Sequence, residues 1–589
     1  MKRLSRLLFL PFCFLAILQP LAAIDREAFT ITRYQLEAQV DRTAHVIAVN
    51  GKLTLRNDSN KPQKLVTLQV SSSLAWNAIT LNDQPLEWLG DNYTSDIDHT
   101  GSLSEVIVTL PKEIAPASTV TLDVQYGGTI TPDATRLTRT GIPAEVAVRN
   151  DWDHISNSFT AVRGLGYVVW YPVAIDAVSL SDGSAVFDAM ARWKQRHERS
   201  EFAARILTPA AQQPLCIAVN GTGSTCGDKQ TVGYSPPGGG TEESSNTLQL
   251  DGLGEMVPAF AIANYVELPR PTIAFTHLPE HTTEARDYAL AAEANDPLLH
   301  DWLHEPHEPA RVIELANPNA NPWKNGAVLF TPLREASTPM LQLLLMPLQV
   351  ASRLHSPHAW IQDGVERFLQ VMAVEMRSGR RAALEYLDQY REPLIEAEKL
   401  SHPAAQAAGA MKASEADNTL LNTNDEVYLH GKGGFVMWML RDMVGTTDMQ
   451  RTLLAYRGGA DKDPSYFQKL LQTNSKRDLE WFFDDWVYRD RGLPEFKVES
   501  VYTRPMLGEG SNFMVTVTIE NRGRTGAEVP GLVQTPSGEK SVRIVVKAGQ
   551  KGTGRLEVPV APDKIVVNDG SVPEASTGNN VYDVPPPVR

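Results

Sequence analysis

Two kinds of apolar pattern divide the chain. Over residues 24–270, apolar and polar residues alternate in short runs, and Asn, Gly and Pro residues separate the runs. Such alternation predicts antiparallel strands that bury one face and expose the other. This part of the chain is therefore predicted to be a β domain. The predicted strands are Tyr34–Val40, Val46–Asn57, Val66–Val70, Val106–Leu110 and Val120–Tyr126.

Beyond residue 270 the apolar residues recur at helical spacing, which predicts a mostly helical domain over residues 271–495. Alternation returns over residues 496–571 and predicts a small C-terminal β-sandwich, and residues 572–589 are expected to form a frayed tail. The predicted fold class is α+β and multidomain. The predicted helices are Thr283–Leu303, Thr338–Leu354, Trp360–Arg377, Arg380–Glu398, Gly433–Val444, Met449–Tyr456 and Leu479–Tyr488.

Residues 1–23 have the pattern of a secretory signal peptide, with a basic start, an apolar run and small residues at the end. The run Leu7–Leu18 is shorter than the roughly 20 residues that cross a bilayer. We therefore expect an exported protein, periplasmic or extracellular, without an integral membrane segment after cleavage. Cleavage leaves Cys216 and Cys226, which are expected to form a disulfide in an oxidising compartment; two unrelated buried thiols are the alternative.

The composition excludes some classes of partner. The chain has 589 residues, too many for one small domain, and its formal net charge is −15. An acidic protein binds polyanions poorly, so nucleic acid is not an expected partner. No nucleotide-binding loop and no serine-hydrolase motif occurs in the sequence.

Four segments of the second half carry a family pattern. WIQDGVERF at Trp360–Phe368 matches the motif that follows a zinc helix, and NPWKNGAVLFTPL at Asn321–Leu333 occupies the place of a G-A-M-E-N strand. The third and fourth segments are EVYLHGKGGF at Glu426–Phe435 and LEWFFDDWVYRDRG at Leu479–Gly492. These segments resemble the aminopeptidase N-like gluzincins, the membrane alanyl aminopeptidase family. The resemblance implies a thermolysin-like helical domain, a zinc cofactor and peptide substrates.

The same resemblance shows what is missing. Such enzymes hold zinc with two histidines one helical turn apart, and a glutamate next to the first acts as base. Aligned on Trp360, the five positions of this HExxH motif are occupied by Pro347, Leu348, Gln349, Val350 and Ala351. No zinc cofactor is therefore expected. The vestigial catalytic candidates are Asp363, at the position of the third ligand, Glu366, and Tyr428, a candidate for the oxyanion-stabilising tyrosine.

Other histidines offer only weak metal patterns. His300 and His304 have helical spacing but no third ligand, and His355 and His358 flank Pro357, which keeps them off one helical face. The inverted pattern HLPEH at His277–His281 contains Pro279 at a predicted strand end.

Three functional hypotheses follow. The first is an exported pseudopeptidase that binds peptide or protein without zinc-dependent hydrolysis. The second is an active metallo-aminopeptidase with a non-standard metal site, and the third is a purely structural protein. The sequence does not indicate the oligomeric state.

Overall fold

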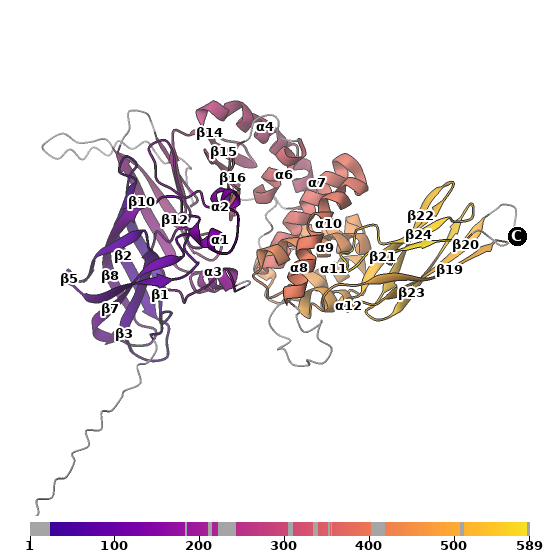
Figure 1. Ribbon diagram of the computed structural model, residues 1–589, viewed down its shortest axis with the longest axis horizontal. Helices are drawn as coiled ribbons and strands as arrows, with labels where there is room; N and C mark the ends of the chain where they lie inside the picture. Colours follow the sequence, from indigo (N-terminus) through magenta and orange to yellow (C-terminus); the bar gives the residue numbers. More distant parts are fainter. Residues whose placement is uncertain are drawn as a thin grey trace, which may run out of the picture.

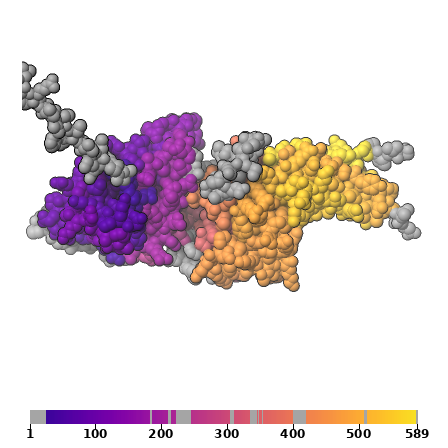
Figure 2. All heavy atoms as spheres, turned by 90° about the horizontal axis from the view of Figure 1, so that it is seen from below, coloured from indigo at the N-terminus to yellow at the C-terminus, as the bar shows by residue number. Residues whose placement is uncertain are grey.

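The structure is a computed structural model that describes residues 24–182, 185–209, 215–221, 243–303, 310–333, 340–351, 354, 356–401, 419–506 and 512–585. The N-terminal sheets, the helices and the C-terminal sheets follow one another along the long axis (Figures 1 and 2). This arrangement confirms the α+β multidomain class. In these described ranges no helix is both long and apolar enough to cross a membrane.

The N-terminal domain is built from two large sheets that bury a shared apolar core. All five predicted strands are present, because alternating apolar residues point into this core. Strand order in the larger sheet is β12-β10-β1-β2-β8-β4-β5, and in the smaller one β3-β7-β6. The larger sheet contains β1 (Phe29–Asp41), β2 (Val46–Asn57), β4 (Leu74–Leu81), β5 (Gln84–Pro85), β8 (Thr119–Thr129), β10 (Glu201–Pro209) and β12 (Glu243–Leu250). The smaller one contains β3 (Gln63–Ser71), β6 (Glu87–Thr94) and β7 (Ser102–Ile114).

Three helices of this domain, α1, α2 and α3, lie on its side toward the helical domain (Figure 1). A third sheet has the order β11-β13-β9. The helix α3 was not among the predicted elements, although its buried residues Val186, Ala189 and Trp193 recur at helical spacing. These elements are β9 (Thr160–Val162), β11 (Cys216–Val219), β13 (Phe260–Ala263), α1 (Thr135–Arg139), α2 (Ala144–Asn150) and α3 (Ala185–Arg196).

A five-stranded mixed sheet of order β14-β15-β16-β18-β17 stands at the boundary of the two predicted domains, and four of its strands lie in the region predicted to be mostly helical. Strands β15, β16 and β18 are parallel, and α4 and α6 pack against the sheet. Helical periodicity alone did not predict this sheet, because its strands are short continuous apolar runs. The strands are β14 (Val266–Leu268), β15 (Ile273–His277), β16 (Ala310–Glu314), β17 (Trp323–Asn325) and β18 (Val328–Thr331).

Most predicted helices are present with shifted ends. The segment Thr283–Leu303 is two helices, because the chain turns at Asn295 before Pro297. Helix α6 extends through position 347, so its proline does not end the helix. Helix α7 bends at Gly379, whose φ of 82° favours glycine. The helices are α4 (Thr282–Glu293), α5 (Asp296–Trp302), α6 (Met340–Ala351), α7 (Ala359–Asp388), α8 (Arg391–Ser401), α9 (Glu426–Val444), α10 (Thr446–Ala455), α11 (Tyr466–Ser475) and α12 (Glu480–Phe483), with short 3₁₀ turns η1 (Pro279–His281) and η3 (Gly458–Ala460) and the π-helical turn η4 (Asp484–Tyr488).

Helices α7 and α9 cross at two glycines, Gly364 and Gly433. A Cβ atom added to Gly364 would lie 2.9 Å from the carbonyl oxygen of Gly433, a distance that side chains do not adopt. The glycine of the WIQDG motif is therefore required for close helix packing, and this crossing fixes the position of the residues beside it.

The C-terminal part is a β-sandwich of a three-stranded and a four-stranded sheet. Its apolar residues continue the core of the helical domain, and the Trp486 indole donates a 2.7 Å hydrogen bond to the Gly526 carbonyl. The segment predicted to be a frayed tail instead supplies β25, which pairs with β24, and Val572 is buried. The strands are β19 (Phe496–Pro505), β20 (Phe513–Asn521), β23 (Lys551–Val558), β21 (Ala527–Thr535), β22 (Gly538–Val546), β24 (Lys564–Val567) and β25 (Val581–Asp583).

Candidate functional site

Helix α6 carries apolar residues where a zinc-binding helix has its ligands. Leu348 is fully buried in an apolar cluster with Phe368 of α7. Val350 is buried in a second cluster with Phe275 and Val312 of the five-stranded sheet. Helix α6 therefore packs between α7 and the sheet. At the aligned motif positions, Pro347 and Ala351 replace the two histidine ligands and Leu348 replaces the glutamate base, so the residues present do not fit the metal.

The Asp363 and Glu366 carboxylates of α7 lie near basic groups of other elements. The Asp363 carboxylate is 17% exposed and lies 3.6 Å from Nε2 of His430, too far for a direct hydrogen bond. The Glu366 carboxylate is 5% exposed and forms a short ion pair with the ammonium of Lys324. Both carboxylates therefore have basic neighbours from other elements.

His430 is neutral at neutral pH. Burial, together with the nearby Arg367 guanidinium, lowers the pKa of His430 to about 4. Arg367 is held by hydrogen bonds of 2.8 Å to the Gln370 side chain and the Tyr390 hydroxyl. Burial also raises the pKa of Asp363, although Lys324, Arg367 and Lys194 oppose this shift.

Charged groups from three elements face Asp363. Lys194 comes from α3 of the N-terminal domain, and burial lowers its pKa although Glu426 and Asp363 oppose this. A hydrogen bond of 3.1 Å from the Asn424 amide to Asp188 joins α3 to the segment before α9. We call the following residues the interdomain charge cluster: Lys194, Lys324, Asp363, Glu366, Arg367, Glu426 and His430. It combines three cations, three carboxylates and one neutral imidazole.

Aromatic side chains border this cluster on the N-terminal side. The rings of Tyr167 and Trp323 meet edge to face with centroids 5.6 Å apart, and Trp323 directly precedes Lys324. Burial raises the pKa of the Tyr167 hydroxyl, and the charge of Glu426 contributes to this shift. Tyr167 and Glu426 therefore lie near one another across the domain boundary.

Tyr428 belongs to a different, buried network. Its hydroxyl donates a hydrogen bond to Asp490 at 2.5 Å and lies 3.1 Å from the Glu398 carboxylate, and the Lys432 ammonium donates to it at 2.9 Å. Lys432 also forms short ion pairs with Asp490 and Glu398. Tyr428 and Lys432 are one helical turn apart and share a face of α9, whereas His430 points roughly 200° away from Tyr428. The structure therefore does not bring Tyr428 together with Asp363.

The segment in place of the G-A-M-E-N strand is a tight hairpin. Gly326 has a φ of 60° in the turn between β17 and β18, and a Cβ there would overlap the Met256 side chain. Leu329 and Phe330 are buried. The strand therefore presents no carboxylate for a peptide amine.

The weak metal candidates do not assemble. His300 is exposed at the end of α5, and Nε2 of His358 lies 3.4 Å from Asp461. His304 and His355 lie outside the described residues, as does Cys226, so the Cys216–Cys226 disulfide stays a prediction. Among residues that the structure describes, no group of three or more His, Cys, Asp or Glu side chains is arranged to hold a metal ion.

Sequence reasoning missed the cationic half of the interdomain charge cluster. Lys194 and Lys324 come from α3 and β17, far from Asp363 in the chain. No local spacing relates these residues, because only the tertiary fold brings them together.

Comparison with solved structures finds an M1 zinc metallopeptidase from Deinococcus radiodurans. A glutamate-to-alanine mutant bound to a Tyr-Ser-Ala substrate matches with a TM-score of 0.43 and 14% identity, covering 79% of this chain and 95% of that chain. A structure of the same mutant without that substrate matches with a TM-score of 0.42 and 15% identity, covering 78% of this chain and 95% of that chain. A further structure of the enzyme matches with a TM-score of 0.43 and 15% identity, covering 79% of this chain and 95% of that chain. No family model and no curated protein matches the sequence.

Proposed function

We propose that this protein binds peptides at the interdomain charge cluster and does not hydrolyse them with zinc. The observation that carries the proposal is that the protein has this charge cluster while the residues of α6 at the zinc-site positions are apolar. Leu348 and Val350 supply neither a ligand nor a base, whereas Asp363 and Lys324 keep partly exposed charges at the domain boundary. The protein would retain recognition groups without the catalytic ones.

The mixed charges favour a peptide over a simple ion. A peptide has an ammonium group at one end and a carboxylate at the other, and its backbone offers donors and acceptors between them. Asp363 and Glu426 are the candidate acceptors for the ammonium group, while Lys194 and Lys324 are the candidate partners for carbonyl or carboxylate oxygens. Tyr167 and Trp323 add apolar ring surface beside these charges.

Calorimetric titration with tetra-alanine tests this proposal. The peptide with a free amine should bind reversibly, and N-acetylation or Asp363→Asn should each weaken binding about tenfold, the effect of one charged hydrogen bond. Glu385→Gln is the control, because Glu385 is an exposed carboxylate on the same helix α7. It should bind as the wild type does.

Mass spectrometry of the titrated peptide tests the second half of the proposal. The tetra-alanine should be recovered intact after prolonged incubation, with or without added zinc, because Pro347 and Ala351 cannot hold a zinc ion that would activate water and Leu348 cannot accept a proton. Absence of saturable binding would refute peptide recognition. Hydrolysis that a chelator and Asp363→Ala both abolish would instead support an active enzyme with a non-standard metal site.

A further inference from the structure

The interdomain charge cluster contains two kinds of charged group. Some are already bound by other side chains of the protein. The Lys324 ammonium forms a short ion pair with Glu366, and the Arg367 guanidinium donates hydrogen bonds to Gln370 and Tyr390. These groups are held in place and contribute little to the binding of a small ligand.

The second kind of group consists of Lys194, Asp363 and Glu426. In the described part of the chain, none of the three forms an ion pair with another of the three. Lys194 is half-buried, Glu426 is exposed and the Asp363 carboxylate is 17% exposed, so all three can be reached from solvent. One ammonium and two carboxylates are therefore available for a ligand.

The two carboxylates lie beside the same face of α9. Glu426 is the first residue of this helix and lies one turn before His430, and residues four apart share a helix face. Nε2 of His430 lies 3.6 Å from the Asp363 carboxylate. Burial raises the pKa of Glu426, and the negative charge of Asp363 adds to this shift. A cation placed between two such carboxylates favours the charged form of both.

The Lys194 ammonium approaches these carboxylates from the N-terminal domain. Its helix α3 lies on the side of that domain toward the helical domain (Figure 1), and the Asn424 amide donates a 3.1 Å hydrogen bond to Asp188 of α3. Burial lowers the pKa of Lys194, whereas the charges of Glu426 and Asp363 oppose this shift. Because charges more than about 10 Å apart are largely screened, we place the ammonium within about this distance of both carboxylates.

This spacing limits the length of a ligand that bridges the three groups. An extended peptide gains at most about 3.5 Å per residue, so its terminal charges lie roughly 6 Å apart in a dipeptide and roughly 13 Å apart in a tetrapeptide. A charged hydrogen bond at each end adds about 2.8 Å. A dipeptide can therefore contact both sides of the cluster with its two ends, whereas an extended tetrapeptide is too long.

Building on the peptide-binding function proposed above, we propose that the interdomain charge cluster binds a short zwitterion end to end, with its ammonium group between Asp363 and Glu426 and its carboxylate on Lys194. A dipeptide and a free amino acid both offer this chemistry. Longer peptides bind through their ammonium end alone. The rings of Tyr167 and Trp323 supply apolar surface for the ligand's carbon atoms.

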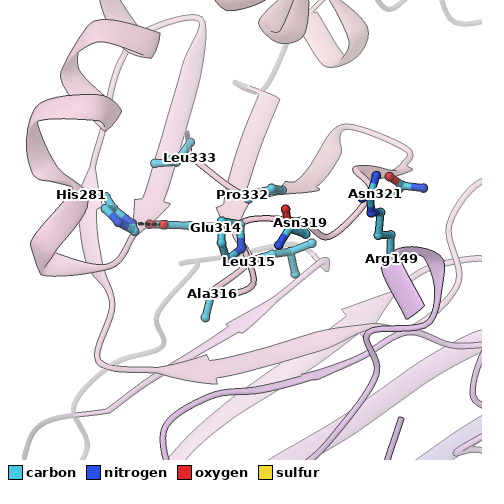
Figure 3. Close-up of a pocket in the computed structure, with 10 residues that line it drawn as sticks. Arg149, His281, Glu314, Leu315, Ala316, Asn319, Asn321, Pro332 and Leu333 are labelled. Carbon is cyan, nitrogen blue, oxygen red and sulfur yellow. Dashed lines mark hydrogen bonds and ion pairs between the residues drawn. The ribbon is translucent and has the colours of Figure 1, made fainter. Parts of the chain in front are cut away.

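A separate pocket offers no comparable set of charges. It has a volume of about 600 Å³ and lies at the carboxyl ends of β16 and β18 (Figure 3). Its two basic residues, Arg149 and His281, lie at opposite ends, and the His281 imidazole pairs with Glu314 at short distance (Figure 3). Arg149→Gln is therefore a control for binding outside the interdomain charge cluster.

Calorimetric titration of the full-length mature protein with Ala-Ala, its C-terminal amide and alanine tests the proposal. Amidation should weaken the binding of Ala-Ala about tenfold, the effect of one charged hydrogen bond, and Lys194→Met should weaken it by a similar factor. In Lys194→Met, amidation should cost no more than about twofold, because the carboxylate has lost its partner. Amidation of tetra-alanine should likewise change wild-type binding by no more than about twofold.

Matched variants control for indirect effects. Arg192→Met removes an exposed cation from the same helix α3, and it should bind Ala-Ala as the wild type does. Arg149→Gln should also bind as the wild type does. Lys194→Arg keeps the positive charge and should retain the loss of affinity on amidation.

The outcomes separate this inference from the proposed function. Tighter binding of Ala-Ala than of alanine identifies a dipeptide site, and the reverse identifies a site for a free amino acid. If tetra-alanine saturates the protein but amidation of Ala-Ala costs the wild type no more than about twofold, the end-to-end site is wrong and the peptide proposal is retained. An equal loss on amidation in wild type and Lys194→Met overturns the role of Lys194. Absence of saturation with every probe refutes the peptide proposal itself.

Discussion

Replacing Leu348 by alanine tests whether apolar packing holds the helix that carries zinc ligands in active peptidases. Leu348 is fully buried between α6 and α7, in one cluster with Phe368. Removing a buried leucine side chain costs about 3–5 kcal/mol, because the apolar contact is lost and a cavity remains. For a domain of this size, about 3 kcal/mol corresponds to a lowering of the melting temperature by roughly 6–12 °C.

Differential scanning calorimetry of wild type, Leu348→Ala and Gln349→Ala measures this effect. Gln349 is the matched control, because it is the next residue of α6 and only half-buried, and such substitutions change stability by about 0.5 kcal/mol or less. A chelator should not change the wild-type melt, since an ion that is not bound contributes no linkage free energy. A Leu348→Ala melt equal to that of Gln349→Ala would refute the packing argument, and a chelator-induced drop would reveal a structural metal.

Three further predictions concern buried charges and cysteines. Lys432→Met should cost about 3–5 kcal/mol, because it leaves Asp490 and Glu398 buried without their cation, whereas Lys469→Met at an exposed pair should cost less than about 1 kcal/mol; equal urea midpoints would contradict this. The pKa of His430 is about 4 in the folded protein and about 6.5 when unfolded, so the unfolded chain gains protons first and stability is lost as pH falls through this window. His430→Gln should reduce the loss between pH 7 and pH 5 by about 1–2 kcal/mol in urea titrations, and an unchanged loss would contradict the assignment. Thiol titration of the denatured, unreduced mature protein should find no free Cys216 or Cys226, and two thiols per chain would refute the disulfide.

The sequence predicts those parts of the fold in which a local pattern coincides with burial. The alternation of Val46–Asn57 is also the burial pattern of β2, so period and environment agree. Helix α9 begins well before the predicted Gly433, because the Asp425 side chain caps its first turn with bonds to Val427 and Tyr428. Its glycines lower the local helix propensity, but Gly433 is required by the crossing with Gly364, so tertiary packing overrides propensity.

Some residues of the candidate site can likewise be found from a local sequence pattern, and others only from the tertiary structure. Asp363 and Glu366 are found from the sequence because they occur within one motif on one helix. Lys194, Lys324 and His430 join them only through the packing of α3, β17 and α9. Tyr428 shows the converse, since it lies four residues before Lys432, where the family pattern has its tyrosine two residues before the lysine, and its side chain lies on the opposite face of α9 from His430 and binds Asp490.

Zinc content is the most direct test of the central proposal that this protein does not hold zinc where the sequence resemblance would place it. Purified mature protein is incubated with excess zinc, dialysed against metal-free buffer and measured by elemental analysis, with Asp363→Ala in parallel. We expect well under one zinc per chain in both proteins, because Pro347 and Ala351 occupy the positions where histidine ligands are needed. One zinc per wild-type chain that is lost in Asp363→Ala would contradict the claim.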